Sequence, residues 1–81
     1  MHRFHHRKAF GGAIRACRKK AGISQERLAE RAGMSSNFIS EVERANMECS
    51  VTSALRIARA LGVHICDLLR DVGGRDPLVE D

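Results

Sequence analysis

The 81-residue sequence contains no tryptophan, no tyrosine and only three phenylalanines. A buried core must therefore be built from leucine, isoleucine, valine, alanine and methionine, and this scarcity of aromatic residues suits packed helices better than a sheet. The length fits one domain rather than two. We predict one small all-α domain whose stability is modest or depends on a second copy of the chain.

Long apolar runs and paired cysteines are also missing. No apolar run approaches the roughly 20 residues that a membrane span needs, and the first residues contain no apolar signal core. The three cysteines, Cys17, Cys49 and Cys66, form no CxxC pair, which excludes a disulfide framework and a zinc site by spacing. We therefore expect a cytoplasmic, reduced protein without a metal, a cofactor or a membrane partner.

Acidic residues are missing from the first 20 positions, which hold seven of the fourteen basic residues. The next 40 positions balance five basic with five acidic residues, and the remainder holds five acidic against two basic residues. A basic leading segment on a neutral body favours a polyanionic partner. A disordered tail that only contacts solvent would show the same charge pattern, so the charge alone leaves both interpretations open. We expect a flexible basic arm over residues 1–7, a folded domain over residues 8–71 and a disordered acidic tail over residues 72–81.

Apolar residues recur at helical spacing in five segments that capping or breaking residues separate. The predicted helices cover residues 8–20, 25–32, 36–44, 52–61 and 64–71. Ser24 and Ser35 precede two of them as N-caps, and Gly33 supplies the positive φ that closes the second. In the fourth helix the expected buried stripe consists of Val51, Ala54, Leu55, Ala58 and Leu61. Two short helices joined by a tight turn at Gly33 can place the later one in the major groove of DNA.

The third predicted helix has two different sides. At about 100° per residue, its polar residues share one arc of about 140°, and these are Ser36, Asn37, Ser40 and Glu41. Its apolar residues Phe38, Ile39 and Val42 face the opposite side, with Phe38 at the edge of the core. A helix that lies between a protein body and a DNA groove requires this division.

The polar residues of this side fit contacts with base edges better than they fit helix stability. Asn37 can bond an adenine edge through two hydrogen bonds. Ser36 and Ser40 have poor helix propensity, and a helix built for stability alone would use alanine, lysine or glutamate there. Glu41 leaves two interpretations open, because it can accept a hydrogen bond from a cytosine amine or pair with Arg44 or Lys19 in solvent.

A longer set of residues between positions 11 and 69 has the order and spacing of a known family. The set comprises Gly12, Ile14, Arg15, Arg18 and Lys19, then Gly22–Glu26, Leu28 and Ala29, then Gly33–Ser35, Ile39, Ser40 and Val42–Arg44, and finally Ile57, Ala58 and Ala60–Val63. With these residues the sequence resembles the Cro/repressor-type (XRE) helix-turn-helix domain of phage repressors and small bacterial regulators. The resemblance implies a compact five-helix repressor-like fold, in which the second and third helices are the DNA-reading pair.

The resemblance also implies roles for individual residues. Base-facing positions of the family are matched by Ser36, Asn37, Ser40 and Glu41. Phosphate-contacting positions are matched by Gln25, Ser35, Arg44 and Asn46. A structural ion pair between the first and third helices is matched by Arg18 and Glu43, and the loss of one member of such a partly buried pair should cost about 3 kcal/mol.

Two positions depart from the family pattern. Ala45 stands where the family usually has glycine, and Cys49 stands where it usually has proline. Alanine at a position that requires positive φ costs about 1 kcal/mol. This substitution leaves open the shape of the loop after Arg44 and the phosphate contacts of Arg44 and Asn46.

Together these features predict a sequence-specific transcriptional regulator that binds double-stranded DNA. A unit this small contacts about half of a useful operator, so we expect a homodimer on a two-fold symmetric site. The expected dimer surface on the fifth helix consists of Val63, Ile65, Leu68 and Leu69, unless these residues only close the core of one chain. We expect no small-molecule ligand.

Three other functions have some support in the sequence. An antitoxin-like protein-interaction module could use the same fold, with the acidic tail as its contact. A metal sensor could use His2, His5 and His6, although this cluster lacks the acidic or cysteine ligands of a specific site. Catalysis by Cys49 and His64 would lack an oxyanion hole and a third orienting group.

Overall fold

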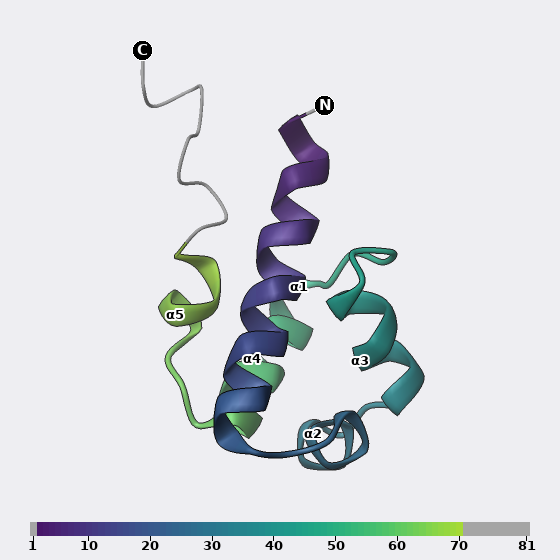
Figure 1. Ribbon diagram of the computed structural model, residues 1–81, viewed down its shortest axis with the longest axis vertical. Coiled ribbons are helices and arrows are strands. Elements are labelled where there is room, and N and C mark those ends of the chain that lie inside the picture. The colour runs from purple at the N-terminus through teal and green to yellow at the C-terminus, as the bar shows by residue number, and fades with distance from the viewer. Residues whose placement is uncertain (1, 71–81) are drawn as a thin grey trace.

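The computed structural model describes the backbone of residues 2–70 and the side chains of residues 6–70, and within these ranges it contains α-helices and no strand (Figure 1). The helices are α1 (His2–Ala21), α2 (Gln25–Ala32), α3 (Ser36–Glu43), α4 (Val51–Leu61) and α5 (Ile65–Leu69). This confirms the predicted all-α fold with five helices. The expected tail over residues 72–81 and the side chains of His2 and His5 lie outside the described part.

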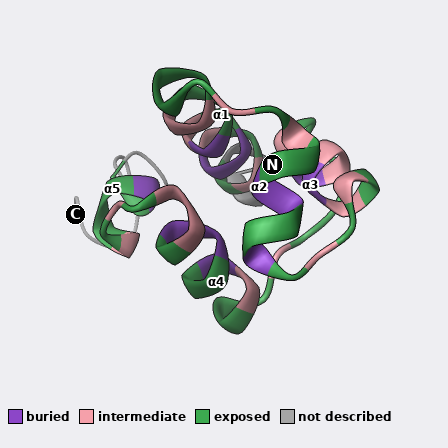
Figure 2. Cartoon of the chain, turned by 90° about the horizontal axis from the view of Figure 1, so that it is seen from below, coloured by how far each residue is buried: buried purple, intermediate pink, exposed green. Residues whose placement is uncertain are grey.

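The long helix α1 is the element around which the other helices pack. It contacts α3 on one side and α4 and α5 on the other, while α2 connects α3 with α4 (Figure 1). The core residues are almost all aliphatic: Phe10, Ile14, Leu28, Ala29, Ala32, Ile39, Val42, Ala54, Ile57, Ala58 and Leu68. Figure 2 shows these buried positions on the inward sides of the helices. No helix of the described part is long and apolar enough to cross a membrane.

The beginning of α1 differs from the prediction. The helix starts at His2 rather than near residue 8, so residues 2–7, which were expected to form a flexible arm, provide its first turns. No glycine or proline precedes Gly11, so nothing in this segment interrupts the helix that the apolar face from Phe10 onward stabilises.

The starts of α2 and α3, and the turn between these helices, follow the predicted capping pattern. The hydroxyl of Ser24 accepts a hydrogen bond from the Arg27 amide at 3.0 Å, and that of Ser35 accepts one from the Phe38 amide at 3.1 Å. Gly33 adopts a left-handed backbone with a φ of 72°, which glycine tolerates without steric cost. The Met34 amide then donates to the Ala29 carbonyl at 2.8 Å, and this bond completes the end of α2.

Gly11 allows α1 to approach the carboxyl end of α3 closely. A Cβ atom on Gly11 would lie 2.4 Å from the carbonyl oxygen of Val42 and 2.8 Å from that of Glu43. The same atom on the neighbouring Gly12 would meet nothing within 4 Å. One helical glycine is therefore required by packing, and the adjacent one is not.

We predict opposite effects of the same substitution at these two neighbours. Gly11→Ala should lower the free energy of unfolding by about 1–3 kcal/mol, because α1 and α3 must separate to admit the methyl group. Gly12→Ala should raise it by about 0.5–1 kcal/mol, because alanine restricts the unfolded chain and nothing obstructs its methyl group. Urea denaturation followed by circular dichroism measures both values, and similar effects at the two sites would contradict the close approach.

Candidate nucleic-acid interface

Helix α3 lies at the margin of the molecule, with its apolar side against α1 and α2 (Figures 1 and 2). Ile39 and Val42 are buried on that side. On the outer side Asn37 is exposed, and the other three residues expected to face bases are half-buried: Ser36, Ser40 and Glu41. These four polar side chains of α3 are therefore not part of the buried core.

The residues expected to contact phosphate lie around this outer side of α3. Ser35 is exposed and caps the start of α3, while Arg44 and Asn46 are exposed directly after its end. Gln25 is half-buried at the first position of α2. Because the first amides of α2 and α3 have no partners within their own helices, both helix starts favour a negatively charged group.

A hydrogen-bonded network around Glu43 connects three helices. Arg18 of α1 donates from Nε to Glu43 Oε2 at 2.7 Å and from Nη2 to Oε1 at 3.2 Å. Gln25 Nε2 donates to the same Oε1 at 3.0 Å, and Arg18 Nη1 donates to the carbonyl oxygen of Ile23 at 2.9 Å. The side chains of Arg18 and Glu43 are only 12% and 2% exposed. The network therefore holds the end of α3 to α1 and to the start of α2.

Glu41 and Arg44 form a second, exposed pair on the outer side. Arg44 Nη2 donates to Glu41 Oε2 at 2.6 Å, and the arginine side chain is 61% exposed. Of the interpretations that the sequence left open for Glu41, the structure contains the pairing with Arg44. Exposed pairs of this kind contribute only about 0–1 kcal/mol, so either residue can exchange its partner when a polyanion approaches.

The loop after α3 keeps the conformation that glycine would favour, although alanine occupies the position. Ala45 has a φ of 65°, which costs an alanine about 1 kcal/mol. Its amide donates to the Val42 carbonyl at 3.0 Å, and the Asn46 amide donates to the Glu41 carbonyl at 2.9 Å. These two bonds form a Schellman motif, which holds Arg44 and Asn46 directly at the end of α3.

The expected dimer surface needs a correction. Leu68 is fully buried in the core of the single chain, so no partner can contact it, because the short α5 turns this side chain toward α1 and α4. Val63 and Ile65 are half-buried, and Leu69 is 44% exposed.

Helix α4 contains two exposed apolar residues that the sequence assigned to its buried stripe. Val51 is 77% exposed and Leu55 is 49% exposed. The buried face of α4 instead runs through Ala54, Ile57 and Ala58. We call the exposed or half-buried apolar surface of these two helices the α4–α5 face, and it consists of Val51, Leu55, Ile65 and Leu69.

Of the two alternative chemical sites, the structure describes the side chains of Cys49 and His64, but of the histidine cluster only that of His6. His64 Nδ1 accepts a hydrogen bond from the Cys66 amide at 3.3 Å, and this contact caps α5. Burial raises the pKa of the Cys49 thiol, which makes it a poor nucleophile at neutral pH. The side chains of residues 6–70 form no cluster of three potential metal ligands.

Comparison with known proteins shows that the helix-turn-helix segment and the surrounding helices recur in other proteins. A family model described as helix-turn-helix matches residues 14–68. An uncharacterised HTH-type transcriptional regulator from Methanothermobacter thermautotrophicus is 46% identical over 56 residues, which are 68% of this chain and 81% of that protein.

Several crystal structures, among them a gene regulator and a repressor, share the fold at more than 30% sequence identity. The clp gene regulator ClgR from Corynebacterium glutamicum is 33% identical, with a TM-score of 0.80 over 85% of this chain and 88% of that one. The P22 c2 repressor, crystallised in complex with a synthetic operator, is 36% identical, with a TM-score of 0.70 over 75% and 92% of the two chains.

We predict that the Glu43 network dominates the stability of this region. Arg18→Met should lower the free energy of unfolding by about 3–5 kcal/mol, because it leaves the buried Glu43 carboxylate without its cation. The matched control is Arg27→Met, which removes an exposed pair with Glu30 and should cost less than about 1 kcal/mol. Urea unfolding measures both values, and equal losses would show that burial of the pair has no consequence.

Proposed function

The chain belongs to the XRE-type helix-turn-helix family of DNA-binding transcriptional regulators, and from this premise we propose that it reads a specific double-stranded sequence with α3 in the major groove. The observation that carries the proposal is the outward polar side of α3, which the buried Glu43 network holds in a fixed orientation. The P22 c2 repressor, a structural neighbour crystallised on an operator, supports this use of the fold.

Base recognition is assigned to the first half of α3. The exposed amide of Asn37 can donate to and accept from one adenine edge, and Ser36 and Ser40 lie beside it on the same side. Glu41 can accept from a cytosine amine once Arg44 exchanges its carboxylate partner for a phosphate. The four side chains would thus contact neighbouring base pairs of one half-site.

Phosphate contacts would fix the position of α3 in the groove. Ser35, Arg44 and Asn46 flank the reading side, and Gln25 lies at the start of α2 beside Glu43. Exposed cations of α1 add attraction that does not depend on sequence, and these are Arg15, Lys19 and Lys20. Because such contacts release counterions, affinity should fall steeply as the salt concentration rises.

We assign the second copy of the chain to the α4–α5 face. One domain of this size contacts one half-site, so specific binding requires a two-fold dimer on a symmetric operator. The α4–α5 face supplies the contiguous exposed apolar residues that a dimer interface needs. The regulator would then act as a homodimer in the cytoplasm.

The decisive test is Asn37→Ala. We expect a 5- to 150-fold loss of affinity for the selected operator, equivalent to about 1–3 kcal/mol, and a relaxed preference at one base pair of each half-site. Selection from random duplexes gives the operator, and fluorescence anisotropy gives the affinities at fixed salt. The control, Cys66→Ser on α5, should retain the parent affinity. Unchanged affinity and preference in Asn37→Ala would refute groove reading by α3.

The dimer assignment predicts that polar substitutions on the α4–α5 face separate the two copies. Leu55→Ser or Leu69→Ser should weaken dimerisation at least ten-fold in sedimentation equilibrium and lower operator affinity accordingly. Met47→Ser is the matched control, because Met47 is similarly exposed (40%) but lies in the loop after α3. If Met47→Ser dissociates the dimer and the two leucine variants do not, the interface lies elsewhere.

A further inference from the structure

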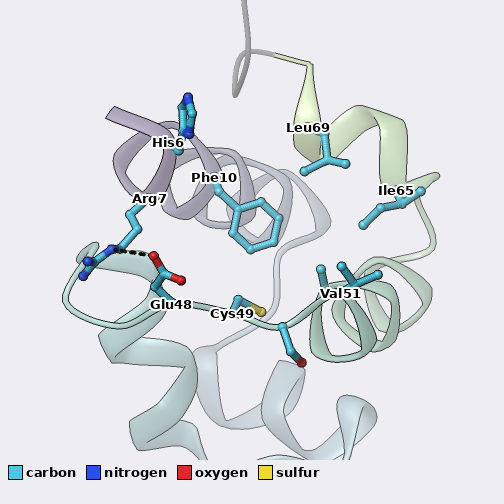
Figure 3. A pocket seen from close by; sticks show the side chains of 10 residues that line it. His6, Arg7, Phe10, Glu48, Cys49, Val51, Ile65 and Leu69 are labelled. Atoms are coloured by element: carbon cyan, nitrogen blue, oxygen red, sulfur yellow. Dashed lines mark ion pairs between the residues drawn. The ribbon is translucent and has the colours of Figure 1, made fainter. Parts of the chain in front are cut away.

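An apolar groove of about 240 Å³ lies between the first half of α1, the loop before α4, and helices α4 and α5. Figure 3 shows the Phe10 ring at its centre, with Ile65 and Leu69 on the α5 side and Val51 at the start of α4. At the opposite end Arg7 and Glu48 form an ion pair, and Cys49 lies between this pair and Val51. We call this hollow the α1–α5 groove.

At the polar end of the groove one buried hydrogen-bond donor is left without a partner. Arg7 Nε lies 3.5 Å from Glu48 Oε2, yet this buried nitrogen has no hydrogen-bond partner within the described part of the chain. An unsatisfied buried donor costs about 1–3 kcal/mol, so an additional oxygen ligand would be favourable there. His6 and Lys8 are exposed on the neighbouring positions of α1. The chemistry that fits the groove is an apolar side chain accompanied by a carboxylate.

Residues 71–81 have this composition and follow α5 directly. They contain apolar Val72, Leu78 and Val79, and their four acidic residues against Arg75 give a net charge of −3. Leu69, two residues before this segment, already lines the groove. The eight residues from 71 to 78 span up to about 26 Å when extended. This length allows Leu78 to reach Phe10.

We propose that residues 71–81 bind the α1–α5 groove of their own chain, with Leu78 and Val79 against Phe10 and a neighbouring carboxylate on Arg7. The segment would then cover Val51, Ile65 and Leu69, three residues of the α4–α5 face. It would compete with the second copy of the chain for the same apolar surface. DNA does not fit the groove, because the mostly apolar walls offer few hydrogen-bond donors to phosphates.

The thiol of Cys49 reports whether the groove is occupied. In the 81-residue chain, the double variant Leu78→Ser/Val79→Ser removes the apolar side chains without changing any residue of helices α1–α5. At a concentration at which sedimentation shows a monomer, N-ethylmaleimide should modify Cys49 at least five-fold faster in this variant than in the parent chain. Mass spectrometry of the modified peptides measures the rate separately for each cysteine.

Two controls make this result specific to the groove. Cys66 is exposed and does not line the groove, so its modification rate should be equal in both proteins. Arg75→Gln, within the same segment, keeps Leu78 and Val79 and should leave Cys49 protected. Circular dichroism verifies that the fold is unchanged.

Two results would overturn the proposal. An equal Cys49 rate in the parent and the double variant would show that residues 78 and 79 do not cover the groove. Protection that appears only at concentrations at which the parent dimerises would assign the groove to the second copy. Because no DNA is present in this experiment, its outcome is independent of whether α3 reads a major groove.

Discussion

The position of α3 depends on the buried carboxylate of Glu43. A carboxylate that is 2% exposed is tolerated only where cations and donors surround it, because desolvation of an unpaired charge costs several kcal/mol. Arg18 and Gln25 supply these donors from α1 and α2. Any rotation or sliding of α3 would break this network, so the requirement to satisfy one charge fixes the orientation of the whole helix.

The backbone contact at Gly11 acts on the same end of α3. The carbonyl groups of Val42 and Glu43 lie against α1 without an intervening side chain, so α3 is held by packing as well as by charge. Its N-terminal half, with Asn37 on the outer side, has no such contacts. The carboxyl end of α3 is therefore fixed to the rest of the fold. The outer residues of its N-terminal half, which we propose face the bases, could change without loss of the contacts that orient the helix.

The sequence predicted the helix-turn-helix segment because the signals for it are local. The caps Ser24 and Ser35, the left-handed Gly33 and the period of 3.6 residues depend on near neighbours, and the helices follow them closely. The burial of Leu68, the exposure of Val51 and Leu55, and the close approach at Gly11 depend on how separate helices pack. A periodic pattern identifies an apolar stripe, but it does not indicate which edge of the stripe a neighbouring helix covers.

The small core also explains why apolar residues remain available on α4 and α5. A core with one buried aromatic residue, Phe10, does not cover every apolar side chain, and Val51 and Leu69 line the groove at the surface. A segment tethered to the same chain has an effective concentration on the order of millimolar. If residues 71–81 occupy the groove, each copy must release that segment before the α4–α5 faces meet. Because only copies with a free groove can dimerise, the dissociation constant of the dimer rises as the free fraction falls. A two-fold operator would favour the released form, because only the dimer contacts both half-sites. In this arrangement dimerisation and operator binding would reinforce each other.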